Sequence, residues 1–312
     1  MVKKLELEAL TAEVASLGEL LRTRTPEEDP IGYFQYSQRK AYIQERIEKL
    51  GATPELEASI ALFFAGDPVT GSRGIKANFV GRAVAVFQDL VSKRFASTEL
   101  GELGQRGRIP LRSNSDLMLT DVMRGSFGLM QSESVETAPL VETQLKTVLE
   151  SVVESIDITT AADSEGFEAL LEDIDARYLR SLSEFFELLD EERATVRLVE
   201  GDIDHQFDSV QLHRARERTS AARIDELDDK QMQGILYLLP AHRKFELVLA
   251  SGESIWGSVS REFATAHLEA MRDASEVVGH KWSVTTSVRT VTRPNQEPRV
   301  THKLTRLLER AD

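Results

Sequence analysis

The sequence predicts an α+β protein built from a small helix-covered sheet, an acidic helical hairpin and a small β-barrel. Three observations predict this fold class. An apolar segment at residues 58–65 suits a buried strand, and a glycine-containing loop and a long amphipathic helix follow it. Helical periodicity dominates residues 138–192. Short strand-like segments separated by tight turns follow residue 232. We therefore expect domains at residues 1–135, 136–192 and 193–312, the last with a helical insertion.

Length and composition exclude several classes of protein. A chain of 312 residues is long enough for about two separate cores. There is no cysteine, so disulfides, thiolate catalysis and cysteine metal sites are excluded. The N-terminus has no apolar signal region, and no apolar run approaches the roughly 18 residues of a membrane helix. We expect a cytoplasmic protein that does not contact membranes.

Charge is unevenly distributed along the chain. The net charge is −14, which argues against broad nucleic-acid affinity. Residues 70–130 nevertheless hold nine Lys and Arg against five Asp and Glu, whereas residues 133–204 hold twenty acidic and five basic side chains. These blocks must neutralise each other or face different partners. We favour an assembly in which the basic face of one subunit meets the acidic face of the next.

Two helices are expected before the central strand. Over residues 3–23, leucine and valine recur at alternating spacings of three and four, which predicts a helix with a narrow coiled-coil-like seam. A second helix is expected over residues 36–49. Pro26 and Pro30 mark the connector between them.

The loop after the central strand contains TGSRGIK, residues 70–76. We predict that Gly71 or Gly74 has a positive φ and that the next helix begins within two or three residues of Ile75. The loop is not a P-loop, because Ser72 and Arg73 stand where a P-loop has its phosphate-binding lysine and the following serine or threonine. It either holds an anion or partner, or is a turn that lets strand and helix pack closely. The candidate binding residues are Gly71, Ser72, Arg73, Gly74 and Lys76.

A long loop rich in glycine and arginine follows the central helix. Its candidate contact residues are Arg106, Arg108 and Arg112, which suit phosphate or an acidic protein surface. Apolar and polar residues then alternate on both sides of the sequence RGS, which predicts a β-hairpin with Arg124 at its turn.

Two acidic helices are expected next, over residues 145–156 and 167–189. Asp163 or Ser164 is the expected N-cap of the second. Their acidic face is either a solvated surface or a docking site for a basic partner. A strand at 194–200 and a polar, basic segment at 206–224 follow.

The C-terminal barrel is expected from strands at 235–239, 244–249 and 254–259, then a helix at 262–276 and two more strands. The strand order and the SGE turn at 251–253 resemble an SH3-like or Sm-like barrel. Trp256 and Trp282 lie in predicted strands of this barrel. They either pack in its core or stack bases and grip peptides from its surface.

Signatures of catalysis are weak. The acidic turn DIDHQFD places Asp202, Asp204, His205 and Asp208 close together, which suits either Mg²⁺ or Mn²⁺ binding or a solvated turn. The histidines lack the spacing of a helical zinc motif, and no nucleophile elbow is present. We therefore assign no catalytic residue, and expect neither a cofactor nor a metal.

The segments GDPVTGSRGIKANF and RGSFG resemble uncharacterised bacterial proteins found in antiphage-defence gene clusters. That resemblance implies no catalytic residue. Together with the arginine-bearing loops, it favours a non-enzymatic binding or assembly subunit of a bacterial multi-protein system, forming a homo-oligomer or binding a partner protein. One alternative is a metal-dependent nuclease or nucleotide hydrolase that holds an anion at residues 71–76. Another is a nucleic-acid-binding protein that uses the basic region 70–130.

Overall fold

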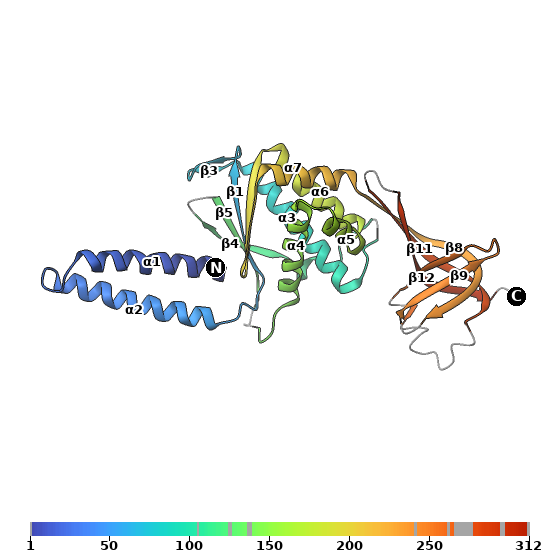
Figure 1. The fold of residues 1–312 in the computed structure, drawn as a ribbon, viewed down its shortest axis with the longest axis horizontal. Coiled ribbons are helices and arrows are strands. Elements are labelled where there is room, and N and C mark those ends of the chain that lie inside the picture. The colour runs from blue at the N-terminus through green and yellow to red at the C-terminus, as the bar shows by residue number, and fades with distance from the viewer. Residues whose placement is uncertain are drawn as a thin grey trace. The chain divides into compact units, whose positions relative to one another are not determined.

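The computed structural model describes residues 2–104, 106–123, 127–135, 139–239, 242–260, 263–264, 277–293 and 297–310. The chain forms two compact units. Unit 1 comprises Met1–Leu170 and Arg180–Arg218, and unit 2 comprises Leu171–Leu179 and Thr219–Asp312. Helices and mostly antiparallel sheets make up the two units, which confirms the predicted α+β class (Figure 1).

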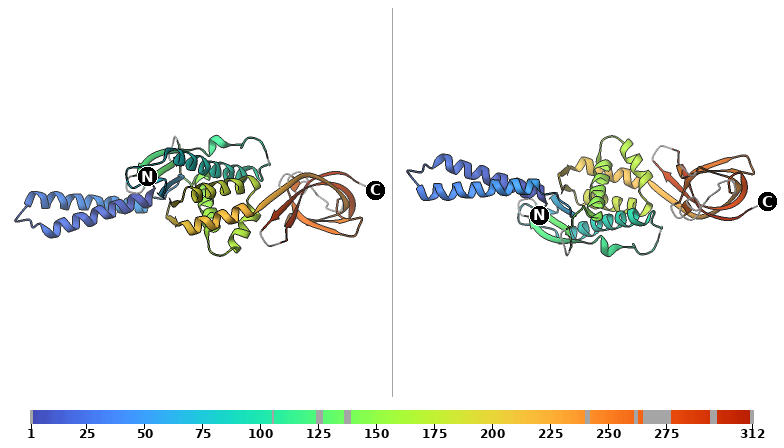
Figure 2. Two further views of the ribbon diagram at one scale, coloured as in Figure 1. Left: turned by 90° about the horizontal axis from the view of Figure 1, so that it is seen from above. Right: turned by 90° about the horizontal axis from the view of Figure 1, so that it is seen from below.

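Unit 1 begins with two antiparallel helices that lie side by side, as Figure 2 shows. Helix α1 spans Lys3–Thr23, as predicted, and helix α2 spans Pro30–Ala52. The α2 helix begins six residues earlier than expected because Asp29 caps it and Pro30 occupies its first turn, where a missing N–H costs nothing. The seam between the helices consists of Leu10, Val14, Leu17, Tyr36, Ile43, Ile47 and Leu50.

The sheet of unit 1 has five antiparallel strands in the order β4-β5-β1-β6-β7. Their bounds are β1 Ser59–Gly66, β4 Leu117–Met123, β5 Phe127–Glu133, β6 Ala194–Glu200 and β7 Ile203–Phe207. The central strand β1 is buried on both faces, as its apolar sequence predicts. Phe64 meets Phe79 of helix α3 edge to face at 5.3 Å, and Phe63 lies in a cluster with Val2 and Leu5 of the N-terminal segment.

The glycine-containing loop folds as a small hairpin. Strands β2 (Val69–Thr70) and β3 (Gly74–Ile75) pair with each other, and helix α3 (Ala77–Leu100) follows. Gly71 has a φ of 53°. Both the positive φ and the position of the helix start are therefore confirmed.

The acidic segment contains three helices, α4 (Gln144–Thr160), α5 (Glu165–Asp173) and α6 (Ala176–Glu191). The single helix expected over 167–189 is wrong, because Asp175 interrupts it. Its Oδ1 accepts hydrogen bonds from the backbone N–H groups of Arg177 and Tyr178, at 2.9 and 2.8 Å. An aspartate that bonds the amides ahead of it starts a new helix, although the apolar spacing continues across the break. Helix α7 (Ser209–Ala221) lies within the polar segment that follows β7.

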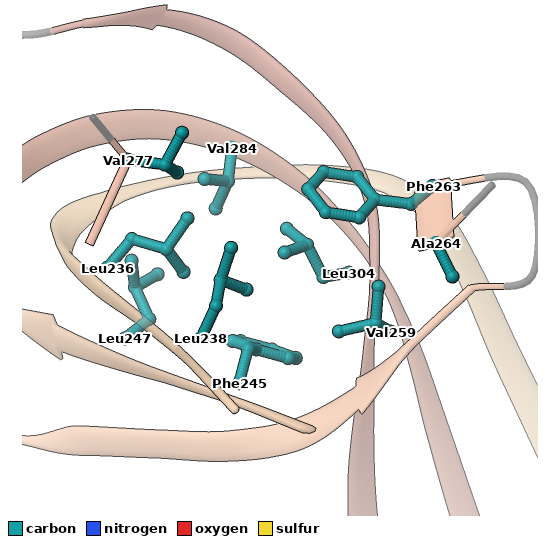
Figure 3. Close-up of a cluster of buried hydrophobic side chains, with 10 residues drawn as sticks. All are labelled: Leu236, Leu238, Phe245, Leu247, Val259, Phe263, Ala264, Val277, Val284 and Leu304. Carbon is teal, nitrogen blue, oxygen red and sulfur yellow. The ribbon is translucent and has the colours of Figure 1, made fainter. Parts of the chain in front are cut away.

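Unit 2 contains a closed five-stranded barrel, which confirms the predicted small barrel. Around the barrel the strands are ordered β10-β12-β11-β8-β9, and only the β10–β12 contact is parallel. Their bounds are β8 Arg223–Leu239, β9 Lys244–Leu249, β10 Ser254–Val259, β11 His280–Thr292 and β12 Arg299–Arg310. Figure 3 shows the apolar core, formed by Leu236, Leu238, Phe245, Leu247, Val259, Phe263, Ala264, Val277, Val284 and Leu304.

The first strand of the barrel is longer than predicted. Strand β8 begins at Arg223, twelve residues before its predicted start, because its polar first part pairs with β11 along its length. The helix expected at 262–276 lies outside the described residues except for Phe263 and Ala264. Among the described helices of both units, none combines the length and apolarity that a membrane span requires.

Candidate functional site

The loop at residues 70–76 is closed by its own backbone. The N–H of Arg73 donates to Thr70 O at 3.0 Å, and the N–H of Lys76 donates to Pro68 O at 2.9 Å. The Lys76 side chain lies 3.2 Å from a carboxylate oxygen of Glu192. Gly71, Ser72 and Arg73 are exposed, and Gly74 is half-buried. Of the cations predicted here, Arg73 is the one without an ion pair to a described residue.

The arginine-bearing loop comprises residues 101–116. Hydrogen bonds attach the C-terminal end of this loop to helix α3. Gln88 donates to Ser115 O at 2.8 Å and accepts from the N–H of Leu117 at 2.9 Å. Arg112 pairs with Asp89 at 3.2 Å. Arg106 and Arg108 are exposed and form no ion pair with a described residue. The loop therefore holds one arginine against α3 and presents the other two to solvent.

The predicted binding residues do not form one surface. Helix α3 has 24 residues and is about 36 Å long. The hairpin with Arg73 lies before the N-terminal end of this helix. The arginine-bearing loop starts at the C-terminal end of the helix and returns to its middle, at Gln88. Arg124 lies outside the described residues.

Most of the predicted acidic turn is strand β7, Asp202 alone of its acidic residues lies in a turn, and the side chains diverge. Asp204 accepts two hydrogen bonds from Arg197, at 2.7 and 2.6 Å, and these bonds lower its pKa. His205 contacts Asp157 at 3.1 Å, and Asp208 caps helix α7 through the N–H of Gln211. Asp202 is exposed in the β6–β7 turn. Within the described part of the chain, no three His, Asp or Glu residues converge as metal ligands would.

The two tryptophans have different roles. Trp282 packs against the barrel core and donates its Nε1–H to Val277 O at 3.0 Å. Trp256 on β10 is 58% exposed. Trp282 therefore packs against the core, whereas Trp256 lies at the surface of the barrel.

Trp256 belongs to an apolar surface on strands β8, β9 and β10, which we name the barrel face. Register places Glu246 directly between Tyr237 and Trp256, so the two aromatic side chains lie about two strand spacings apart, roughly 10 Å. Ile235, Tyr237 and Leu239 are 38%, 41% and 47% exposed, and alternate along β8 with the buried Leu236 and Leu238. In the sequence, the uninterrupted apolar run ILYLL at residues 235–239 indicates that both faces of this strand are apolar.

A second region that the sequence did not reveal is the interior acidic pocket of unit 1, a cavity of about 400 Å³. Lys146 is 5% exposed and hydrogen-bonds to Glu150, and its Nζ lies 3.8 Å from Glu200 and 4.0 Å from Glu142. Burial acts to lower the pKa of Lys146, but these carboxylates raise it overall. Burial raises the pKa of Glu200 to about 7, against the opposing effect of Lys146. The pocket is lined by Lys3, Pro54, Glu55, Glu142, Lys146, Glu150, Glu200, Gly201, Asp202 and Ile203.

Comparison of this chain with protein-family models, with curated proteins and with solved structures finds no match.

Proposed function

We propose that this chain is a non-enzymatic binding or assembly subunit whose barrel face contacts a polypeptide partner. The observation that carries the proposal is that Trp256 is exposed on β10 while Tyr237, Ile235 and Leu239 are partly exposed on β8, two strands away. Contiguous exposed apolar patches mark interaction sites. Tryptophan and tyrosine are also the side chains that most often dominate the energy of protein interfaces.

Charge on the barrel face favours a polypeptide with a basic residue. The half-buried Glu246 lies between the two aromatic side chains. Its carboxylate would repel a phosphate but would pair with a lysine or arginine placed between two apolar side chains. Lys244 and Lys281 are exposed, and register places them beside Leu239 and Ile235. They give the apolar surface a charged rim.

The arginine-bearing loops form the second contact surface of the proposal. Arg73, Arg106 and Arg108 suit an acidic protein face, in a partner protein or in the acidic helices of a second copy. The setting that we propose, a bacterial multi-protein antiviral system in the cytoplasm, depends on the resemblance of residues 66–79 and 124–128.

A second candidate function is binding of single-stranded nucleic acid, and the strand order of the barrel favours it. We infer that the barrel is of the OB type and not SH3-like or Sm-like. In support, β8 pairs with both β9 and β11, and β10 and β12 pair in parallel. OB-type barrels bind oligonucleotides on the face of their second and third strands, here β9 and β10. Trp256 and Tyr237 have the exposure that base stacking requires.

A parallel selection separates the two functions. A displayed random peptide library and a random single-stranded DNA pool are each selected on the full chain, and bound sequences are retested on Trp256→Ala. Tyr42→Ala is the matched control, because Tyr42 is 57% exposed on helix α2. We expect peptides that combine apolar residues with a lysine or arginine, bound at least tenfold more weakly by Trp256→Ala and equally well by Tyr42→Ala. Selected DNA that depends on Trp256, with no such peptide, would replace the proposal with the nucleic-acid function.

A further inference from the structure

The interior acidic pocket contains carboxylate oxygens without hydrogen bonds. Glu200, at the end of β6, is 1% exposed, and its Oε1 accepts no hydrogen bond from any described residue. The Oε1 of Glu55 accepts a hydrogen bond from Ser59 Oγ at 2.6 Å, while its buried Oε2 accepts no hydrogen bond from the described residues. Buried polar atoms in folded proteins almost always have partners. Glu200 and Glu55 both line the cavity, and the two oxygens therefore point to a donor that the described residues do not supply.

The cations that line this pocket are already engaged. Lys146 donates a hydrogen bond to Glu150. Its Nζ lies 3.8 Å from Glu200 Oε1, which is beyond hydrogen-bonding distance. Lys3 donates its Nζ–H groups to Gly51 O at 3.1 Å and Thr53 O at 2.6 Å. Four glutamates and Asp202 line the cavity against two ammonium groups, Lys146 and Lys3, so its carboxylates outnumber its cations. A cationic ligand would supply both the charge and the missing donors.

The arrangement of the carboxylates selects the kind of cation. They are distributed around a cavity of about 400 Å³, within the size range of small-molecule sites. No three of the described acidic groups converge on a point, as a metal ion would require. An alkylammonium group donates up to three hydrogen bonds, and a flexible chain lets successive ammonium groups reach separate carboxylates.

We infer that the interior acidic pocket binds a linear aliphatic diamine or triamine, with one ammonium group held between Glu200 and Glu55. This inference does not depend on the barrel face or on the arginine-bearing loops. It gives unit 1 a small-molecule site of its own.

Calorimetry on the full chain tests the inference, with putrescine and spermidine as the probes. We expect saturable binding of spermidine and a raised Tm, while MgCl₂ at matched ionic strength gives neither. Glu200→Gln keeps the shape of the side chain and removes its charge, and should weaken spermidine binding at least tenfold. Glu184→Gln is the control, because Glu184 is exposed on helix α6 and does not line the pocket.

Glu55→Gln is the second variant, for use if Glu200→Gln does not fold, and should also weaken spermidine binding. Absence of saturable amine binding to the wild type would overturn the inference. So would equal binding by the wild type and both pocket variants, or a preference for Mg²⁺ over spermidine.

The pH dependence of spermidine binding provides an independent test of the role of Glu200. Because the pKa of Glu200 is about 7, its carboxylate is more fully ionised at pH 8 than at pH 6, and spermidine should bind more tightly at pH 8. Glu200→Gln should lose most of this dependence. The other charged groups that line the cavity are Lys3 from α1, Glu55 from the α2–β1 link, Glu142, Lys146 and Glu150 from α4 and its approach, and Asp202 from the β6–β7 turn.

Discussion

The interior acidic pocket and the barrel face depart from the usual distribution of side chains in opposite ways. In the pocket, Lys146 and Glu200 place ionisable groups where apolar groups normally lie. On the barrel face, Trp256 and Tyr237 place apolar surface where polar groups normally lie. Burying charge and exposing contiguous apolar surface both cost stability. The same fold thus combines a pocket of buried charge with an exposed apolar surface, and these are the two features from which we propose binding sites.

The largest expected effect is on stability, and it comes from comparing a side chain inside the barrel with one on its outer surface. Phe245 is fully buried, and Phe245→Ala should lower the free energy of unfolding by about 3–5 kcal/mol, because it leaves a cavity in the core. Trp256→Ala should change it by no more than about 0.5 kcal/mol, because the side chain is mostly exposed. Urea denaturation followed by circular dichroism measures both. A comparable loss for Trp256→Ala would show that Trp256 supports the fold, and would remove the argument for a binding face.

Breaking the buried ion pair should also have a large effect. Lys146→Met should destabilise unit 1 by about 3–5 kcal/mol, because it leaves Glu200 buried without a countercharge. Lys49→Met is the control. Lys49 pairs with Glu45 on the exposed surface of helix α2, and its loss should leave the urea midpoint nearly unchanged, because solvent screens an exposed pair. Equal urea midpoints for the two variants would mean that the pocket is hydrated and weakly charged.

Removing the charge of Glu200 should have a smaller effect on the free energy of unfolding, and should raise it instead of lowering it. Its folded pKa, about 7, lies above the ordinary 4.5, so folding favours the neutral form. This contribution to stability is fully present below about pH 4.5 and is lost as the pH rises through 7. Glu200→Gln should therefore gain about 1–3 kcal/mol over the wild type between pH 5 and pH 8. Thermal unfolding at these two pH values tests this sign, and a gain that shrinks toward pH 8 would contradict it.

The smallest effect is expected at the arginine-bearing loop. Arg106→Glu with Arg108→Glu should leave the free energy of unfolding within about 0.5 kcal/mol, since neither arginine is buried. If these arginines meet the acidic face of another copy, the double variant should be smaller than the wild type in sedimentation at low salt, and high salt should remove the difference. A wild type of constant monomeric size at all salt concentrations would exclude this self-association.

Local signals account for the parts of the fold that could be predicted. The seam of α1, the apolar strand β1 and the positive φ of Gly71 depend on residues close together in the chain. The polar first part of β8 could not be predicted, because it is a strand only through its pairing with β11. The break at Asp175 depends on a side-chain cap that competes with an uninterrupted apolar pattern.

The candidate sites were harder to predict, because they depend on register and on distant segments. Trp256 and Trp282 look alike in the sequence, and only the strand register places one outside the barrel and the other against its core. Glu55, Lys146 and Glu200 come from separate parts of the chain, and no local pattern connects them. The arginines of the loops were found from composition, but their division between the two ends of α3 required the structure.

The central claim is that the barrel face binds an apolar polypeptide with a basic residue opposite Glu246. A charge-swap cycle tests it most directly. Two proteins, the wild type and Glu246→Lys, are each combined with two peptides: a selected peptide, and the same peptide with its basic residue changed to glutamate. The affinity of all four combinations is measured. The claim predicts that either change alone weakens binding at least tenfold and that the two together restore most of the loss. Equal affinity of the original peptide for wild type and Glu246→Lys would contradict it.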